Sequence, residues 1–208
     1  MRLGIIVVGA GGHAKVCIEL LRAMGENVAY CVGAPDSPDN CLGVPILRGD
    51  ENLSFLRSEG YSRVFVAVGS NRLRERLSAL CTGQGYQLVS AISPRAIISP
   101  SATLGRGVAV MAGAIINAES VIEDLAIINT GATVDHDCRI GQAAHIAPQC
   151  APAGNVTAGN HSFLGVGCKV IPETRIGERV TVGAGAVVIY HIESDATAVG
   201  VPARVLIT

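Results

Sequence analysis

The sequence predicts two domains of different class: a small Rossmann-like α/β domain at residues 1–93 and an all-β solenoid of six-residue repeats at residues 94–208. Two observations lead to this prediction. Apolar strands alternate with helical segments in the first half, and an aliphatic residue recurs at every sixth position in the second half. A chain with 49% hydrophobic and 16% charged residues can bury a core in each domain.

The first half has the pattern of a parallel α/β domain. An apolar segment at residues 3–8 is followed by a glycine-rich turn, which is typical of a buried first strand that leads into a helix. The same alternation follows, with a loop rich in Pro, Asp and Gly expected at residues 33–45. We expect strands at residues 3–8, 27–32, 63–69 and 86–92, and helices at residues 14–24 and 71–81.

The second half carries a six-residue repeat in one uninterrupted register. From Ile98 to Val188, fourteen of the sixteen repeat positions hold Ile, Leu or Val, and the exceptions are Pro152 and Ala158. The residue four positions later is small or Val in fifteen of the sixteen repeats. A period of six fits neither an α-helix nor a two-sided strand. Three such repeats make one coil of a triangular solenoid, whose coils stack about 4.8 Å apart.

In such a solenoid the aliphatic residue points inward, the small residue fits under the corner, and a following glycine relieves the turn. Cys138, Cys150 and Cys168 occupy the small-residue position, so we interpret them as core residues and not as nucleophiles. The repeat is weakest around Pro152. A local defect there could make room for a ligand, or it could be a simple bulge.

Composition excludes several classes of function. The net charge of -1 gives no broad basic field for nucleic acid or an anionic membrane. Seven Cys with no C-x-x-C pair indicate reduced thiols in the cytoplasm and neither a disulfide framework nor a zinc site. The apolar run at the N-terminus breaks into glycines too early for a signal peptide or a membrane span.

A glycine-rich turn follows the first strand. Gly9, Gly11 and Ala14 match G-x-G-x-x-G/A between a strand and a helix, where backbone N–H groups can hold a phosphate. An NAD site would need an acid near the end of the second strand, and Asp36 comes only after that place. The motif therefore favours a nucleotide sugar over NAD, and a tight structural turn is the alternative. Residues Gly9, Gly11, Gly12 and His13 are the candidate ligand contacts.

A second candidate segment, Gly69-Ser70-Asn71-Arg72, follows the strand at residues 63–69 and opens a helix. It lies at the carboxyl end of a parallel strand, where such sheets bind ligands. Ser70 and Asn71 are thus either ligand contacts or helix N-caps.

His136 lies two residues after the inward-pointing Val134, so its side chain should project from a corner of the solenoid. Asp135 and Asp137 flank it, and His145 follows nine residues later. The flanking charges and the second histidine distinguish His136 from an ordinary exposed histidine, which is the alternative interpretation.

Several motifs resemble one family in the same order along nearly the whole chain. The ending Gly200-Val201-Pro202-Ala203-Arg204 is similar to the G-x-P-A-K/R tail of hexapeptide-repeat acyltransferases, which form left-handed parallel β-helices. The segment at residues 9–15 and the H-D-C sequence at His136 resemble the sugar O/N-acyltransferases, which include sialic acid O-acetyltransferases and N-acetyltransferases of the bacillosamine and perosamine pathways.

The resemblance implies an acetyl-CoA-dependent N-acetyltransferase that acts on a nucleotide-linked 4-amino-4,6-dideoxy sugar in surface-glycan biosynthesis and works as a cytoplasmic homotrimer. It makes His136 the general base and Asp137 its orienting carboxylate, with Asp135 as a substitute for that role. Acetyl-CoA is then expected at His145, Gly154, Val166, Ala184 and Arg204, and the sugar substrate at Gly9, Gly11, Gly12, His13, Ser70, Asn71 and Asn129.

Other interpretations stay open at this point. O-acetylation of sialic acid or another sugar is the second enzymatic reading, and a non-catalytic scaffold that binds a nucleotide sugar is an alternative of another class. Family members that bind UDP-sugars often carry an acidic pair after the second strand, which is missing here, so the nucleobase is undetermined. The spacing of His136, His145 and His161 does not resemble that of the zinc-binding solenoids, so we expect no metal.

Overall fold

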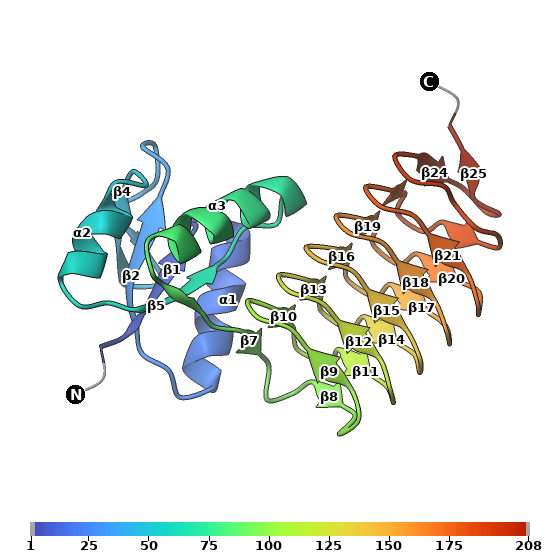
Figure 1. Ribbon diagram of the computed structural model, residues 1–208, viewed down its shortest axis with the longest axis horizontal. Helices are drawn as coiled ribbons and strands as arrows, with labels where there is room; N and C mark the ends of the chain where they lie inside the picture. Colours follow the sequence, from blue (N-terminus) through green and yellow to red (C-terminus); the bar gives the residue numbers. More distant parts are fainter. Residues whose placement is uncertain (1–2, 207–208) are drawn as a thin grey trace. The chain divides into compact units, whose positions relative to one another are not determined.

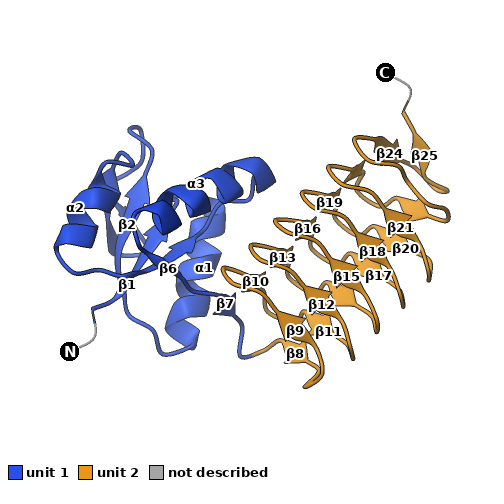
Figure 2. Ribbon diagram, viewed as in Figure 1, with its two compact units in different colours: residues 1–94 blue, residues 95–208 orange. Residues whose placement is uncertain are grey.

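The computed structural model describes residues 3–206, and the chain forms two compact units, residues 1–94 and 95–208 (Figure 2). The predicted boundary lies one residue earlier, so Pro94 belongs to the first unit and not to the second. No helix among the described residues has both the length and the apolar character needed to cross a bilayer.

The first unit contains one six-stranded sheet and three helices (Figure 1). Its strands are β1 (Ile5–Val8), β2 (Val28–Gly33), β3 (Asn40–Cys41), β4 (Val44–Arg48), β5 (Arg63–Val66) and β6 (Gln87–Leu88), and a short β7 (Ala91–Ile92) follows. Its helices are α1 (Gly12–Ala23), α2 (Asn52–Ser58) and α3 (Asn71–Gly83). The strand order β3-β4-β2-β1-β5-β6 places β1 at the centre.

The sheet is parallel except at its β3 edge, as the alternation of strands and helices predicts. The sequence analysis expected a loop at residues 33–45, which overlaps β3 and the first two residues of β4, and it also missed α2. The alternating side chains of β1 face opposite sides of the sheet. Ile6 and Val8 pack with Leu53 of α2 and Leu77 of α3, so these two helices share one face.

The second unit is the predicted solenoid, and its three faces are parallel except at the last strand of the chain, which pairs antiparallel. One face has β10 (Ala109–Val110), β13 (Ile127–Ile128), β16 (His145–Ile146), β19 (Phe163–Leu164), β22 (Thr181–Val182), β24 (Thr197–Val199) and β25 (Arg204–Val205). The next has β8 (Ile97–Ile98), β11 (Ile115–Ile116), β14 (Thr133–Val134), β17 (Ala151–Pro152), β20 (Lys169–Val170) and β23 (Val187–Val188). The third has β9 (Thr103–Leu104), β12 (Val121–Ile122), β15 (Arg139–Ile140), β18 (Thr157–Ala158) and β21 (Arg175–Ile176).

Residues 18 positions apart stack directly on one another, as in the pairs Ile116–Val134 and Ile122–Ile140. The aliphatic repeat positions from Val110 to Val188 are all buried, including Pro152 and Ala158. The small-residue positions from Val108 to Ile192 are buried as well. The prediction that the aliphatic and small residues of each six-residue repeat fill the interior of the solenoid is therefore confirmed.

The role of the glycines differs from the prediction. The corners are turned by residues with positive φ, many of which are not glycine, such as Glu119, Asp137 and Asn155. The glycines that follow the aliphatic positions are needed for a different reason. A Cβ on Gly105 or Gly141 would lie only 2.5 or 2.7 Å from a backbone nitrogen of the next coil. These positions are restricted to glycine by close stacking of the coils and not by the turn.

Pro152 causes no register defect. Its carbonyl accepts a hydrogen bond from the Asp135 N–H at 3.2 Å, and it stacks on Val170 of the following coil. Because proline has no N–H, the sheet ladder is interrupted between β14 and β17 although the coils continue in step. The interruption lies just before the coil corner that carries Gly154.

Candidate active site

His136 is on the corner that follows β14, where its side chain is exposed to solvent. Its Nδ1 lies 2.7 Å from Oδ2 of Asp137. Asp137 has φ +59°, a left-handed conformation that Asp adopts more readily than most residues. This turn brings the carboxylate back onto the ring of the preceding residue. Nδ1–H therefore donates to Asp137, and Nε2 keeps a lone pair available as a base.

Asp135 has a different task. Its Oδ1 accepts hydrogen bonds from the His136 N–H at 2.8 Å and from Nδ2 of Asn117 at 2.9 Å. The bond from Asn117, followed by that from the His136 backbone, lowers the pKa of Asp135. The pKa of His136 is raised, first by its bond to Asp137 and then by the charge of Asp135. Of the two predicted candidates, Asp137 is the one that contacts the imidazole.

Gly154 lies one coil after His136, 18 positions along the chain, and the imidazole lies directly over it. A Cβ at position 154 would be 2.5 Å from Cε1 and 2.6 Å from Nε2 of His136. The Asn155 N–H donates to the His136 carbonyl at 2.9 Å and ties the two corners together. Only glycine leaves room for the ring in this position.

His145 of β16 and Asn129, which directly follows β13, form a second cluster. His145 is 9% exposed and packs edge-on against Phe163, with ring centroids 5.2 Å apart. Oδ1 of Asn129 accepts the Thr130 N–H at 2.8 Å, so its Nδ2 is the atom that faces Nε2 of His145 at 3.0 Å. The amide donates to that nitrogen, which places the proton of a neutral His145 on Nδ1. Asn129, which was predicted to contact the sugar, thus orients His145.

The remaining predicted acetyl-CoA contacts lie on the later coils. Val166 and Ala184 are exposed on one corner, one coil apart. Arg204 lies over the ring of Tyr190, with its guanidinium carbon 5.1 Å from the ring centroid. Tyr190 is on the same corner line as His136 and Gly154, two coils beyond Gly154. Within residues 3–206 no three His, Cys, Asp or Glu side chains come together in a way that could hold a metal ion.

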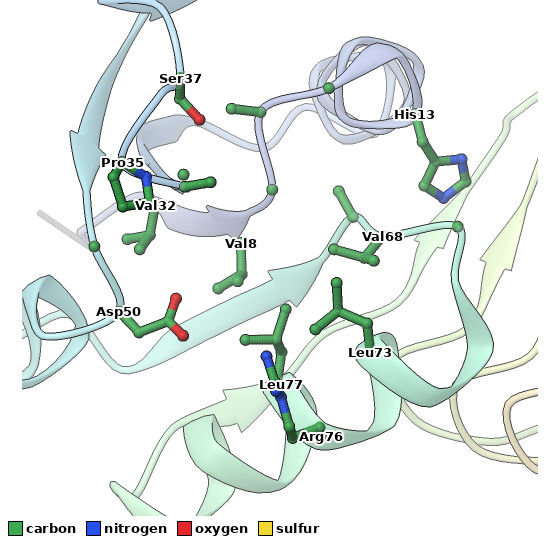
Figure 3. Close-up of a pocket in the computed structure, with 18 of the residues that line it drawn as sticks. Val8, His13, Val32, Pro35, Ser37, Asp50, Val68, Leu73, Arg76 and Leu77 are labelled. Carbon is green, nitrogen blue, oxygen red and sulfur yellow. The ribbon is translucent and has the colours of Figure 1, made fainter.

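The first unit contains a separate cavity of about 680 Å³ at the carboxyl ends of its strands (Figure 3). The glycine-rich segment from Gly9 to His13 lines it. Gly11 caps α1, and a Cβ on Gly11 or Gly12 would meet nothing within 4 Å. The first N–H groups of a helix lack intrahelical partners, so this end of α1 is suited to bind a phosphate.

His13 lines the same cavity. Burial, followed by the positive charge of Arg74, lowers the pKa of His13 to about 4. Its buried Nε2 has no hydrogen-bond partner within the part of the chain that the structure describes. A neutral imidazole with an unsatisfied nitrogen fits a polar group of a bound ligand.

Ser70 and Asn71 do not line the cavity, although Gly69 and Leu73 beside them do. Ser70 is exposed at the N-cap of α3 and makes no side-chain capping bond. Asn71 accepts a hydrogen bond from the buried Arg74 at 2.9 Å. Arg74 also donates to the carbonyls of Val68 and Gly69. This segment thus shapes the cavity wall through Arg74.

Several cavity residues were missed by the sequence analysis. Ser37, Asp50 and Arg76 line the cavity together with apolar residues such as Pro35 and Leu77. Asp50 follows β4, which lies next to β2 in the sheet. If β4 had been recognised as a parallel neighbour of β2, Asp50 could have been predicted as a cavity residue. The carboxyl ends of neighbouring parallel strands lie at the same edge of a sheet.

Comparisons with known proteins identify relatives of this chain. Residues 4–79 match the family model of the PglD N-terminal domain. The chain is similar to PerB from Caulobacter crescentus, solved with CoA and GDP-perosamine, with 52% identity and a TM-score of 0.96 over 99% of this chain and 98% of that one. A histidine-to-asparagine variant of perosamine N-acetyltransferase from the same organism, with the same ligands, has 51% identity and a TM-score of 0.97 over 100% and 99% of the two chains.

Similarity extends to other acetyltransferases. The acetyltransferase domain of PglB from Neisseria gonorrhoeae, in complex with acetyl coenzyme A, has 39% identity and a TM-score of 0.90, with 97% and 98% of the two chains covered. Serine acetyltransferase from Synechococcus elongatus is 31% identical over 65% of this chain and 47% of its own. The chain thus spans about half the length of that curated relative.

Proposed function

The chain belongs to the family of hexapeptide-repeat sugar acyltransferases, and from this membership we propose that it is an N-acetyltransferase that uses acetyl-CoA. Its proposed acceptor is the amino group of a nucleotide-linked 4-amino-4,6-dideoxy sugar, with GDP-perosamine as the leading candidate. Identity of 52% to PerB across nearly the whole of both chains supports this choice. The product, an acetamido nucleotide sugar, suits the synthesis of surface glycans.

The observation that carries the proposal is the geometry at His136. Nδ1 of this exposed imidazole is 2.7 Å from the Asp137 carboxylate, and its Nε2 side lies over Gly154. A base held in one tautomer by a carboxylate is suited to remove a proton from an attacking amine. General base catalysis of this kind contributes roughly 10²–10⁴-fold in rate.

The proposed step transfers the acetyl group directly from sulfur to nitrogen. A bond forms between the amine nitrogen and the thioester carbonyl carbon, the C–S bond breaks, and CoA leaves as the thiol. His136 accepts the amine proton at Nε2, and Asp137 stabilises the resulting imidazolium. The Gly154 N–H is our candidate to stabilise the developing oxyanion. No covalent enzyme intermediate is required.

The residues of the later coils are suited to hold acetyl-CoA. His145 is oriented by Asn129, so its largely buried side chain is preorganised on β16. The exposed Val166 and Ala184 offer apolar and small contacts for the pantetheine arm, and Arg204 provides a positive charge for the phosphates. Bound there, acetyl-CoA supplies the activated acetyl group.

We propose that the enzyme acts as a homotrimer in the cytoplasm. A solenoid corner is convex, so one chain alone encloses little of a ligand, whereas binding sites usually bury most of it. Seven buried, unpaired thiols fit a reducing compartment. Large apolar side chains are exposed along the later coils and fit an interface between chains: Val166, Ile171, Ile189, Tyr190, Val199, Val201, Val205 and Leu206.

The test is a product assay by mass spectrometry. The chain is incubated with acetyl-CoA and either GDP-perosamine, UDP- or dTDP-linked 4-amino sugars, or free sialic acid. We expect one acetyl group on the GDP-linked sugar, on nitrogen and therefore stable to mild base. An alkali-labile acetyl group or acetylation of sialic acid alone would replace this proposal with O-transfer. If the chain binds the nucleotide sugar but no thiol is released from acetyl-CoA, the alternative of a non-catalytic scaffold would be supported.

A further inference from the structure

The nucleotide cavity has an end that the glycine-rich segment does not reach. This end is formed by the loops after β2 and β4, through Pro35, Ser37, Gly49 and Asp50 (Figure 3). If the phosphates bind at the start of α1, the opposite end must receive the nucleobase. The glycine-rich turn supplies no side chain that could distinguish one base from another.

Asp50 is one of the polar residues at this end, together with Ser37 and Glu51. Figure 3 shows the carboxylate of Asp50 pointing into the cavity. Its side chain makes no hydrogen bond and no ion pair with any residue in the range 3–206, and Arg76 of the same cavity lies outside ion-pair distance. A carboxylate that faces a ligand cavity without a protein partner is available to accept hydrogen bonds from the ligand.

The neighbouring Glu51 is occupied differently. A Cβ on Gly49 would lie 2.2 and 2.3 Å from the two carboxylate oxygens of Glu51, so this side chain is folded over its own loop. Asp36, the acid closest to the place where the family often carries a base-reading pair, does not line the cavity. Glu51 also lines the cavity, but its carboxylate lies against Gly49, whereas the carboxylate of Asp50 points into the cavity.

The loop that carries Asp50 is held in place by backbone contacts. The Gly49 N–H donates to the Gly33 carbonyl at 2.8 Å, which joins the ends of β4 and β2. Nδ2 of Asn52 donates to the carbonyls of Arg48 and Gly49 at 2.8 and 3.1 Å. Asp50 therefore projects from a loop of defined shape, as a residue that determines specificity should.

The chemistry of the bases identifies the partner. Guanine presents two adjacent donors, N1–H and the 2-amino group, which match the two oxygens of one carboxylate. Uracil and thymine present a single N3–H between two carbonyl oxygens. A carboxylate that binds this N–H would bring its second oxygen close to a carbonyl oxygen of the base, and the two would repel each other. Adenine and cytosine present one amino group beside an acceptor. Charge-assisted bidentate pairing is strong and specific, so Asp50 favours guanine over the other bases.

We propose that Asp50 is the residue that selects a guanine nucleotide, through a bidentate hydrogen bond to the Watson–Crick edge of the base. The inference rests on the proposed function only in taking the cavity as a nucleotide site. The apolar Val32, Pro35 and Leu77 are available to contact the faces of the ring. Asp50 is a specificity-determining residue and takes no part in acetyl transfer.

The experiment measures nucleotide binding to the full chain by calorimetry, without acetyl-CoA. Wild type is titrated with GDP, with IDP, which lacks the 2-amino group, and with UDP. One lost charge-assisted hydrogen bond predicts about tenfold weaker binding of IDP than of GDP. In Asp50→Asn, binding of GDP should weaken by about tenfold or more, and the preference for GDP over IDP should disappear.

A gain of function makes the test sharper. The amide of Asp50→Asn can donate to the 2-carbonyl of xanthine and accept from N1–H, so this variant should prefer XDP to GDP. Glu51→Gln and Asp36→Asn are the matched controls and should keep the wild-type preference. Melting temperatures of all variants show that each is folded.

Two results would overturn the inference. If Asp50→Asn keeps the tenfold preference for GDP over IDP, another group reads the base. If it weakens GDP, IDP and UDP equally, Asp50 contacts the ribose that all three share. Absence of binding by wild type to all three nucleotides would overturn the nucleotide site itself, whereas GDP binding without acetyl transfer would contradict only the proposed reaction.

Discussion

The imidazole of His136 lies over the backbone of Gly154 in the following coil, so closely that a Cβ at position 154 would come within 2.6 Å of Nε2. The same ring is bonded to Asp137 through Nδ1 at 2.7 Å. The ring is therefore confined by its own coil on one side and by the next coil on the other. A catalytic base confined in this way needs little reorganisation during the reaction.

Replacing His136 by Ala should abolish most of the turnover and leave the fold intact. The side chain is exposed and belongs to a corner of the solenoid, not to its interior. We expect kcat to fall by about 10²–10⁴-fold, with little change in melting temperature or in CoA affinity. His191→Ala, at another exposed histidine of the solenoid, is the control and should keep wild-type kcat. A His136→Ala enzyme with more than a third of the wild-type rate would remove this residue as the base.

Gly154→Ala should displace the His136 ring without unfolding the solenoid. The added Cβ clashes with an exposed side chain that can rotate away, and rotation breaks its bond to Asp137. We expect kcat to fall by at least about tenfold. Gly83→Ala is the control, because a Cβ there meets nothing within 4 Å. Unchanged kcat in Gly154→Ala would show that the position of the ring is not critical.

The pH profile of kcat/KM should respond to Asp137 in a defined direction. The bond to Asp137 raises the pKa of His136, so the base is protonated, and activity lost, at a higher pH than for an isolated histidine. Asp137→Asn removes that charge, and Asn also tolerates the positive φ at this position. In Asp137→Asn the acidic limb of the kcat/KM profile should therefore move to lower pH, and the maximal kcat/KM should be lower than in wild type. Asp135→Asn should move it less in the same direction, and an unmoved limb in both variants would assign it to another group.

Two glycines of the glycine-rich turn should behave differently when replaced. A side chain on Gly11 enters open space in the cavity, so Gly11→Val should keep its melting temperature and CoA affinity while GDP binding weakens by about tenfold or more. Gly9 has φ +119°, and a Cβ there would be 2.6 Å from the Ala67 carbonyl. Gly9→Ala should therefore destabilise the first unit by about 1–3 kcal/mol. If Gly11→Val weakens the binding of CoA and of GDP equally, the turn has only a structural role.

Mixed trimers test whether sites are shared between chains. His136→Ala and Arg204→Glu chains should each be inactive if acetyl-CoA is bound by one chain beside the His136 of another. After subunit exchange the two defects can fall in the same composite site, which leaves other sites intact, so partial activity should return. Native mass spectrometry, which separates trimers that contain different numbers of each variant by mass, verifies the exchange. No recovery after proven exchange, or an active monomer in light scattering, would contradict the shared site.

Local sequence pattern was sufficient for the solenoid and insufficient for part of the first unit. Parallel coils that stack in register force every sixth residue inward, so the pattern from Val110 to Val188 could be read without knowing any contact. Strand β4 contains Pro45 and follows a proline-rich loop, and α2 has only seven residues, so both lack a strong local signal. These elements are determined by tertiary packing. Leu53 and Leu56 of α2, for example, complete the hydrophobic core against the sheet.

The sequence by itself determined that His136 projects from a corner between two acids, because its distance from Val134 decides its direction in a six-residue repeat. Only the tertiary structure decided how those acids are used. Asp137 itself has a left-handed backbone conformation, which turns its carboxylate back to the imidazole ring. Asp135 instead accepts a hydrogen bond from Asn117, which lies 18 positions earlier in the preceding coil. Asp50 likewise reaches the cavity of the first unit because β4 pairs with β2. Contacts between stacked coils and neighbouring strands join residues that local pattern cannot connect.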